Sequence, residues 1–192
     1  MNKHGEIYLP GGINYLSQDE LTNIQSELNK YDITLIATDD HAPQASFNDI
    51  CIFISQNTTE LIVSGLMMPV AYDVLVKSIK FVIQKIKEKV KILQGGQVRE
   101  AQPSIHFKTE NSELIAPIPQ NLTDEQFNKY FESINEAIKT IHHNSEKKYE
   151  YFIIEQQNDG LRVEVKTIIQ YAQDKIEHQK KDEVSSHDEN NR

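Results

Sequence analysis

The sequence predicts a single α+β domain with a mixed or antiparallel sheet and one long central helix. Short β-rich runs alternate with segments of helical periodicity, two segments open with capping-box patterns, and residues 69–92 keep a helical apolar period throughout. The expected elements run β-α-β-β-α-β, as in a split βαβ arrangement, and continue as β-α-β-β-α. We place the domain at residues 1–178, with a candidate internal boundary near 95–103. Residues 179–192 contain one apolar residue, which predicts a disordered polar tail.

The first part of the chain predicts three strands and one capped helix. Ser17 and Glu20 stand at the two ends of a capping box, and apolar residues then recur at helical spacing. The run at residues 50–55 is almost continuously apolar, which is typical of a strand covered on both faces. The expected elements are a strand at 6–9, a helix at 17–30, strands at 33–38 and 50–55, and a polar loop at 39–48 between these two strands.

The longest predicted helix covers residues 69–92, with Pro69 in its first turn. One apolar stripe along it is the expected core face. A narrower second stripe, formed by Val74, Phe81 and Ile92, lies on nearly the opposite side. Because a helix with two apolar stripes needs two neighbours, we interpret this second stripe as a surface for a protein partner or a second copy of the chain.

The second half of the chain predicts a further set of strands and helices. Gly95-Gly96 is expected to end the long helix, and a polar connector follows at 97–103. Thr123 and Gln126 form a second capping-box pattern. The expected elements are strands at 104–107 and 113–116, a helix at 123–142, a strand at 149–155, a turn at 158–160, a strand at 161–166 and a closing helix at 167–179.

Composition limits where the protein works and what it binds. The chain has a formal net charge of −9 and a single cysteine, and its N-terminus carries no apolar export signal. No apolar run reaches the roughly 20 residues that span a bilayer. We therefore expect a soluble cytoplasmic protein without disulfides. An acidic chain repels phosphate, so a nucleic-acid partner is not expected.

One segment departs from this acidic balance. Residues 61–99 carry seven basic and two acidic residues, and four of the lysines share one flank of the predicted helix. Such a flank suits either an anionic membrane surface or a nucleic-acid backbone. The alternative, which we favour, is a solvated helix whose lysines complement the helix dipole and the acidic N-terminal region. The four lysines are Lys77, Lys80, Lys87 and Lys91.

No catalytic fingerprint is present. The sequence lacks a phosphate-binding G-x-x-x-x-G-K-[ST], a G-x-G-x-x-G, a G-x-S-x-G, an H-E-x-x-H and a C-x-x-C, so no catalytic or cofactor-binding residue is predicted. The most site-like cluster is Asp39, Asp40 and His41, whose oxygen and imidazole groups suit a divalent metal. A solvated loop is the simpler interpretation. Cys51 is interpreted as a small core residue, because a nucleophile needs a neighbouring base, and His106 has no companion evident in the sequence.

Three functional hypotheses follow from these observations. The first is a non-enzymatic interaction protein, such as an acidic accessory or inhibitor subunit, which docks through Val74, Phe81 and Ile92. The second is an enzyme with an unfamiliar site near residues 39–41, whose residue types also suit a metal. The third is a peripheral membrane or nucleic-acid binder that uses the lysine-rich helix. The missing fingerprints and the second apolar stripe favour the first hypothesis.

Overall fold

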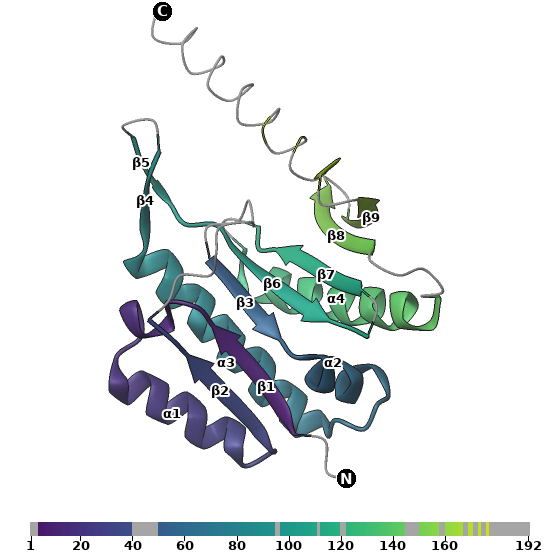
Figure 1. The fold of residues 1–192 in the computed structure, drawn as a ribbon, viewed down its shortest axis with the longest axis horizontal. Coiled ribbons are helices and arrows are strands. Elements are labelled where there is room, and N and C mark those ends of the chain that lie inside the picture. The colour runs from purple at the N-terminus through teal and green to yellow at the C-terminus, as the bar shows by residue number, and fades with distance from the viewer. Residues whose placement is uncertain are drawn as a thin grey trace, which may run out of the picture.

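Seven strands form one mixed sheet in the computed structural model of the chain, and helices pack on it (Figure 1). The structure describes residues 4–39, 50–94, 97–110, 112–119, 122–144, 150–157, 160–166, 169–170, 173 and 176. The sheet contains β1 (Gly5–Leu9), β2 (Ile33–Ala37), β3 (Ile50–Ile54), β6 (Pro103–Lys108), β7 (Ser112–Pro117), β8 (Glu150–Gln157) and β9 (Gly160–Lys166). The helices are α1 (Gln18–Asn29), α2 (Gln56–Val63), α3 (Pro69–Lys89) and α4 (Asp124–Asn144), with a short 3₁₀ helix η1 (Gly12–Asn14) after β1. The predicted α+β class and its long helix are confirmed.

The strand order is β2-β1-β3-β6-β7-β8-β9. Three helical crossovers, through α1, through α2 and α3, and through α4, each join parallel strands that are immediate neighbours: β1 with β2, β3 with β6 and β7 with β8. Antiparallel pairs connect these units. Apart from β4 and β5, which were not predicted, the order of strands and long helices agrees with the predicted one. No strand separates the parallel pairs as it would in a split βαβ arrangement.

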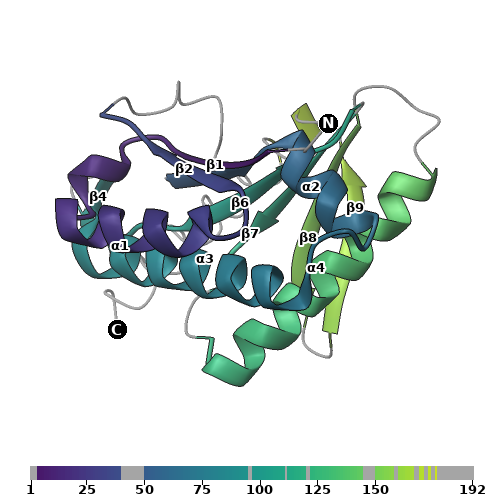
Figure 2. The same ribbon diagram turned by 90° about the horizontal axis from the view of Figure 1, so that it is seen from below.

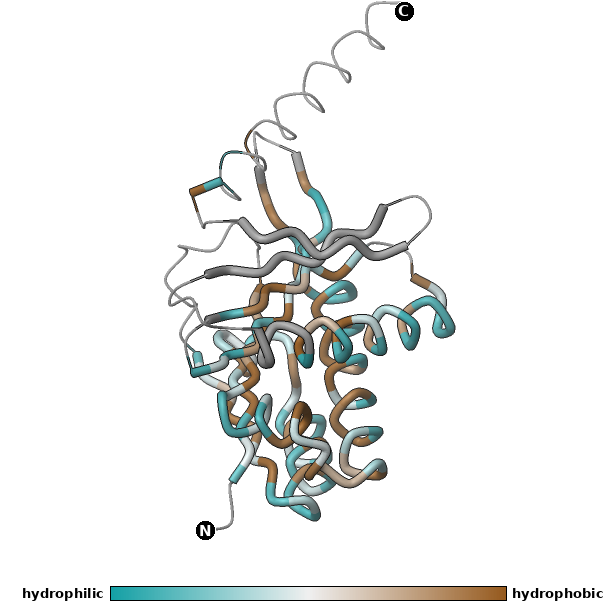
Figure 3. Tube along the Cα trace, turned by 90° about the vertical axis from the view of Figure 1, so that its right-hand side faces the viewer, coloured by the Kyte–Doolittle hydropathy of each residue, from teal (hydrophilic) through white to brown (hydrophobic). Residues whose placement is uncertain are grey.

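The main core lies between the sheet and the helices. Figure 2 shows α1 and α3 on the same side of the sheet. Side chains alternate along each strand, so one set from β3 and β6 meets the buried residues of α3. Apolar and polar residues alternate around the helical turns in Figure 3, as expected for helices with one buried face. The fully buried core side chains include Ile52, Ile54, Ile105, Phe107, Leu75, Ile79 and Ile86.

Both helix starts that the capping-box patterns predicted are present in the structure, with their capping hydrogen bonds. The Ser17 side chain accepts a hydrogen bond from the Glu20 N–H, and the Glu20 carboxylate accepts one from the Ser17 N–H. The Thr123 hydroxyl and the Gln126 side chain make the same reciprocal pair before α4. Each pair satisfies backbone donors that a helix start leaves without an intrahelical partner.

The end of α3 differs from the prediction. The helix stops at Lys89 rather than at residue 92, and Val90 already has an extended backbone. The chain continues as β4 (Lys91–Gln94), which pairs antiparallel with β5 (Gln97–Glu100). The predicted polar connector at 97–103 is therefore mostly strand. Two β-capable runs separated by two glycines are a hairpin signal, and here it overrides the helical apolar period.

The remaining expectations are met in part. Of the predicted closing helix, only residues 169–170, 173 and 176 are described, and these four are helical. The predicted tail at 179–192 lies outside the described residues. Among the helices that the structure describes, none is long and apolar enough to cross a membrane.

Candidate functional site

A row of buried polar side chains crosses three strands on the sheet face opposite the core helices. In β3 the core side chains are Ile50, Ile52 and Ile54, so Cys51 projects from the other face. Cys51 lies opposite Ser104 in the parallel β3–β6 ladder, and His106 follows Ser104 on the same face. Cys51, Ser104 and His106 are 4%, 0% and 3% exposed. The sheet register therefore brings a thiol, a hydroxyl and an imidazole together inside the protein.

Hydrogen bonds join these groups into a chain that ends at a carboxylate. The Ser104 hydroxyl lies 3.7 Å from the Cys51 sulfur and 2.9 Å from Nε2 of His106. On the other side of the ring, Nδ1 lies 2.5 Å from Oε1 of Glu113 on β7. We call Cys51, Ser104, His106 and Glu113 the buried relay. Its four members supply a nucleophile, a bridging hydroxyl, a base and an acceptor that orients the base. Such an arrangement can activate a nucleophile.

The electrostatics of the relay favour a protonated imidazole. Burial alone lowers the pKa of His106, because a charged ring is costly in an apolar interior. Hydrogen bonds to Cys51 and Glu113, together with their negative charges, outweigh this effect and raise the pKa to about 9. At neutral pH His106 is therefore a buried cation between two potential anions.

Aromatic rings enclose the relay on one side. The ring centroids of Phe53 and His106 are 4.8 Å apart, and those of Tyr8 and Phe53 are 6.1 Å apart. Lys108 places its ammonium 5.4 Å from the Phe53 ring. Tyr15, which follows η1, is also buried, and its hydroxyl has no hydrogen-bond partner within the described part of the chain.

A second candidate site is the pair of strands β4 and β5, which we call the arm (Lys91–Glu100). Figure 1 shows the arm rising from the end of α3 and away from the seven-stranded sheet. Lys91 pairs with Glu100 and Leu93 with Val98, so these four side chains share one face. Leu93 and Val98 are 73% and 70% exposed. The arm therefore presents an apolar pair beside one cation and one anion, whose ammonium and carboxylate are 3.5 Å apart.

The predicted second stripe is not an open surface in this structure. Val74, Phe81 and Ile92 are partly buried and pack against the core cluster. Ile92 lies on β4 rather than on the helix, because α3 ends at Lys89. The Lys85 ammonium also lies 5.2 Å from the centre of the Phe81 ring. Whether these residues contact a partner stays a prediction.

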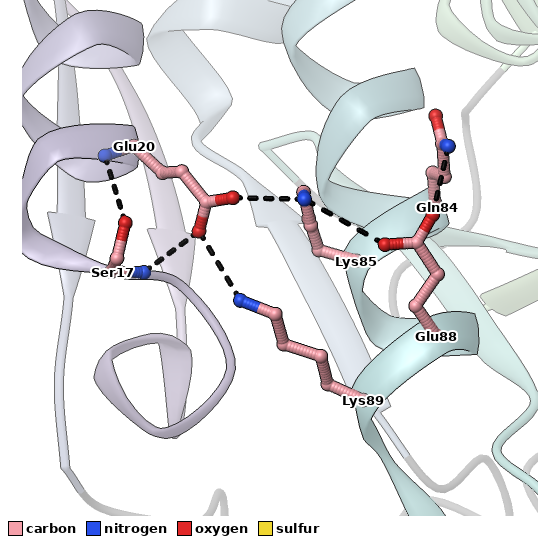
Figure 4. Close-up of polar contacts among 6 residues, drawn as sticks. All are labelled: Ser17, Glu20, Gln84, Lys85, Glu88 and Lys89. Carbon is pink, nitrogen blue, oxygen red and sulfur yellow. Dashed lines mark hydrogen bonds and ion pairs between the residues drawn. The ribbon is translucent and has the colours of Figure 1, made fainter.

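Three of the four lysines of the predicted basic flank contact oxygen atoms of this chain. Lys80 pairs with Asp124 at 2.7 Å, Lys87 donates to the Pro119 carbonyl at 3.3 Å, and Lys91 pairs with Glu100 at 3.5 Å. Lys77 is exposed. On the α1 side of the helix, Lys85 and Lys89 both reach Glu20 (Figure 4). Most of the positive charge is thus neutralised within the fold, which leaves less of it for an anionic ligand.

The predicted metal cluster is only partly described. Asp39 is exposed at the end of β2, and Asp40 and His41 lie outside the described residues. Among the residues that the structure describes, no three His, Cys, Asp or Glu side chains form a group that could hold a metal ion. The metal hypothesis therefore remains an expectation from the sequence.

Sequence reasoning missed both candidate sites. Cys51 is buried, as interpreted, but it faces away from the main core, and His106 does have companions. The alternation of Ser104 and His106 in one strand, with Glu113 just beyond the following turn, was a usable signal. The pairing of Cys51 with Ser104 was not, because 53 residues separate them. The arm could have been found from the two glycines between two short β-capable runs.

Comparison of this chain with protein-family models, with curated proteins and with solved structures finds no match.

Proposed function

We propose that this protein is a non-enzymatic interaction protein that associates with a second copy of itself through the arm. The observation that carries the proposal is the exposed pair Leu93 and Val98 on an element that stands apart from the main sheet. Large apolar side chains that share one face of a projecting element are typical of a contact surface. The arm replaces the second helix stripe as the docking surface that the sequence suggested.

The small size of the arm supports docking. A two-stranded hairpin on its own is only marginally stable in water. Within the described residues β4 and β5 form a sheet of their own, so both are edge strands. Edge strands are the kind to which another chain can add a strand, and docking there removes the two apolar side chains from water.

The charge pattern favours a second copy over a foreign partner. The chain as a whole carries a net charge of −9, so two copies repel each other over most of their surface. The exposed face of the arm, in contrast, carries one cation, Lys91, and one anion, Glu100. Across a two-fold axis the Lys91 of each copy faces the Glu100 of the other, while the apolar pairs meet. The face is therefore complementary to itself.

The experiment is sedimentation of the full chain over a wide range of protein concentration. We expect a concentration-dependent dimer for the wild type and a monomer for the double variant Leu93→Lys, Val98→Lys. The matched control is Leu66→Lys, Met68→Lys, which places two lysines on similarly exposed apolar residues before α3. The control should remain dimeric, because its residues lie at the other end of the helix.

Three results would overturn the proposal. If the wild type stays monomeric at every concentration, the chain does not associate with itself. The proposal then fails even if the arm binds an unrelated protein. A dimer that survives the arm substitutions places the contact elsewhere. Equal dissociation by the arm and control variants would show a general effect of added charge.

A further inference from the structure

We propose that Cys51 is a peroxide-reactive thiol, held as a thiolate by Ser104, His106 and Glu113 and oxidised by hydrogen peroxide to a sulfenic acid. This activity is independent of the arm. It follows from the direction of the hydrogen bonds in the buried relay, from a buried donor that has no acceptor, and from the size of molecule that can reach the sulfur.

The direction of the hydrogen bonds follows from counting protons. A serine hydroxyl has one hydrogen, and here it points to the Cys51 sulfur. The Ser104 oxygen must then accept from Nε2 of His106, so Nε2 carries a hydrogen. Nδ1 also carries one, because its partner is the Glu113 carboxylate, which only accepts. With both nitrogens protonated the ring is a cation. A hydroxyl donor with a cation behind it favours the thiolate form of cysteine.

Tyr15 supplies an observation from outside the relay. Its side chain is 3% exposed, and its hydroxyl has no hydrogen-bond partner among the described residues. Burial, and then the charge of the nearby Cys51, raise the pKa of this hydroxyl, so it stays protonated as a donor. A buried donor without an acceptor is costly. An oxygen atom bound to the Cys51 sulfur is the kind of acceptor that this donor lacks.

Burial selects the oxidant. With Ser104 0% and Cys51 4% exposed, the relay does not admit a peptide, an ester or another bulky substrate, which also argues against a serine hydrolase. Hydrogen peroxide is not much larger than water. Because the chain contains one cysteine, no second thiol of the same molecule can convert the product to a disulfide. Burial equally keeps external thiols away, so the sulfenic acid is the expected end product.

The reaction balances with the groups present and one peroxide molecule. The Cys51 sulfur attacks one peroxide oxygen, so an S–O bond forms and the O–O bond breaks. The departing hydroxide takes the Nε2 proton of His106 through the Ser104 hydroxyl and leaves as water. The sulfur is oxidised by two electrons and the peroxide is reduced by two. His106 ends neutral, and Tyr15 then donates to the new oxygen.

The test is the rate at which the folded full-length protein reacts with hydrogen peroxide at about pH 6, where only a small fraction of an ordinary thiol is ionised. Intact mass reports addition of one oxygen, and a dimedone-type reagent traps the sulfenic acid once the oxidised protein is unfolded in its presence. We expect Cys51 to react about tenfold or more faster than free cysteine. Ser104→Ala and His106→Gln should slow the reaction by about tenfold or more, towards the rate of an ordinary thiol. Tyr15→Phe should shorten the life of the sulfenic acid.

A second measurement covers variants that fail to fold. The ultraviolet thiolate absorption of the native wild type, with Cys51→Ser as the blank, reports the ionisation state of Cys51 while the relay of the wild type is intact. Thiolate absorption at about pH 6 supports the proposal. A thiol that shows no such absorption, or that reacts no faster than free cysteine, overturns it.

Discussion

The Glu20 carboxylate of α1 lies 2.9 Å from the Lys85 ammonium of α3, so a helix-capping residue also joins two helices. Glu20 closes the capping box with Ser17 through one oxygen and reaches Lys85 through the other (Figure 4). The hydrogen bond from the Ser17 backbone, followed by the one from Lys85, lowers the pKa of Glu20 from 4.5 to about 2. One side chain therefore stabilises both a helix start and the packing of α1 on α3.

The Glu20 pKa predicts how stability depends on acid. Because the folded pKa is depressed, the contribution is present above pH 4.5 and is lost as pH falls towards about 2. Urea unfolding over this range should show a steeper loss for the wild type than for Glu20→Gln, whose amide keeps the cap without the charge. Glu27→Gln is the control, since Glu27 pairs with Lys30 at an exposed site. Equal slopes for the wild type and Glu20→Gln would contradict the prediction.

Thr58 joins α2 to the first strand, and its loss has a predictable effect. Its buried hydroxyl accepts from the Glu6 N–H at 2.7 Å and donates to the Glu6 carbonyl at 3.1 Å. Thr58→Val keeps the shape and removes both bonds to Glu6 together with one to the Ser55 hydroxyl, so the free energy of unfolding should fall by about 1–2 kcal/mol. Thr59→Val is the matched control, because this equally buried hydroxyl bonds only within its own helix. The control should lose less than half as much.

Local features of this fold were predictable, and features set by distant contacts were not. The capping residues Ser17 and Glu20, and Pro69 at the start of α3, act within one helical turn, so their pattern is visible in the sequence. The end of α3 depends on the pairing of β4 with β5. This pairing competes with continuation of the helix, which the apolar residues Val90 and Ile92 would favour. The relay required the register of β3 on β6. No local pattern encodes that register, because a whole helical crossover separates the two strands.

The charge on His106 predicts a loss of stability at alkaline pH. Its folded pKa is raised from 6.5 to about 9, so its contribution is complete below pH 6.5 and is lost as pH rises through about 9. The titratable groups that act on it are Cys51 and Glu113. The difference in unfolding free energy between the wild type and His106→Gln should fall by a few kcal/mol across this range. Ring ¹⁵N shifts of an imidazolium at neutral pH would report the charged state of His106 directly. A difference in unfolding free energy that does not change with pH would contradict the prediction.

Substitutions at Phe81 and Leu93 distinguish two candidate docking surfaces. Phe81 belongs to the helix stripe that the sequence suggested, and Leu93 belongs to the arm. Phe81 is partly buried against the core and lies beneath the Lys85 ammonium, whereas Leu93 is 73% exposed. Phe81→Asp should lower the free energy of unfolding by about 1–3 kcal/mol, because it places a charge against packed apolar atoms. Leu93→Asp should change it by less than about 0.5 kcal/mol. Denaturant titration of both variants, at a concentration where the wild type is monomeric, makes the comparison. If Phe81→Asp were as stable as the wild type, its ring would be free to contact a partner, and the helix stripe would again compete with the arm as the docking surface.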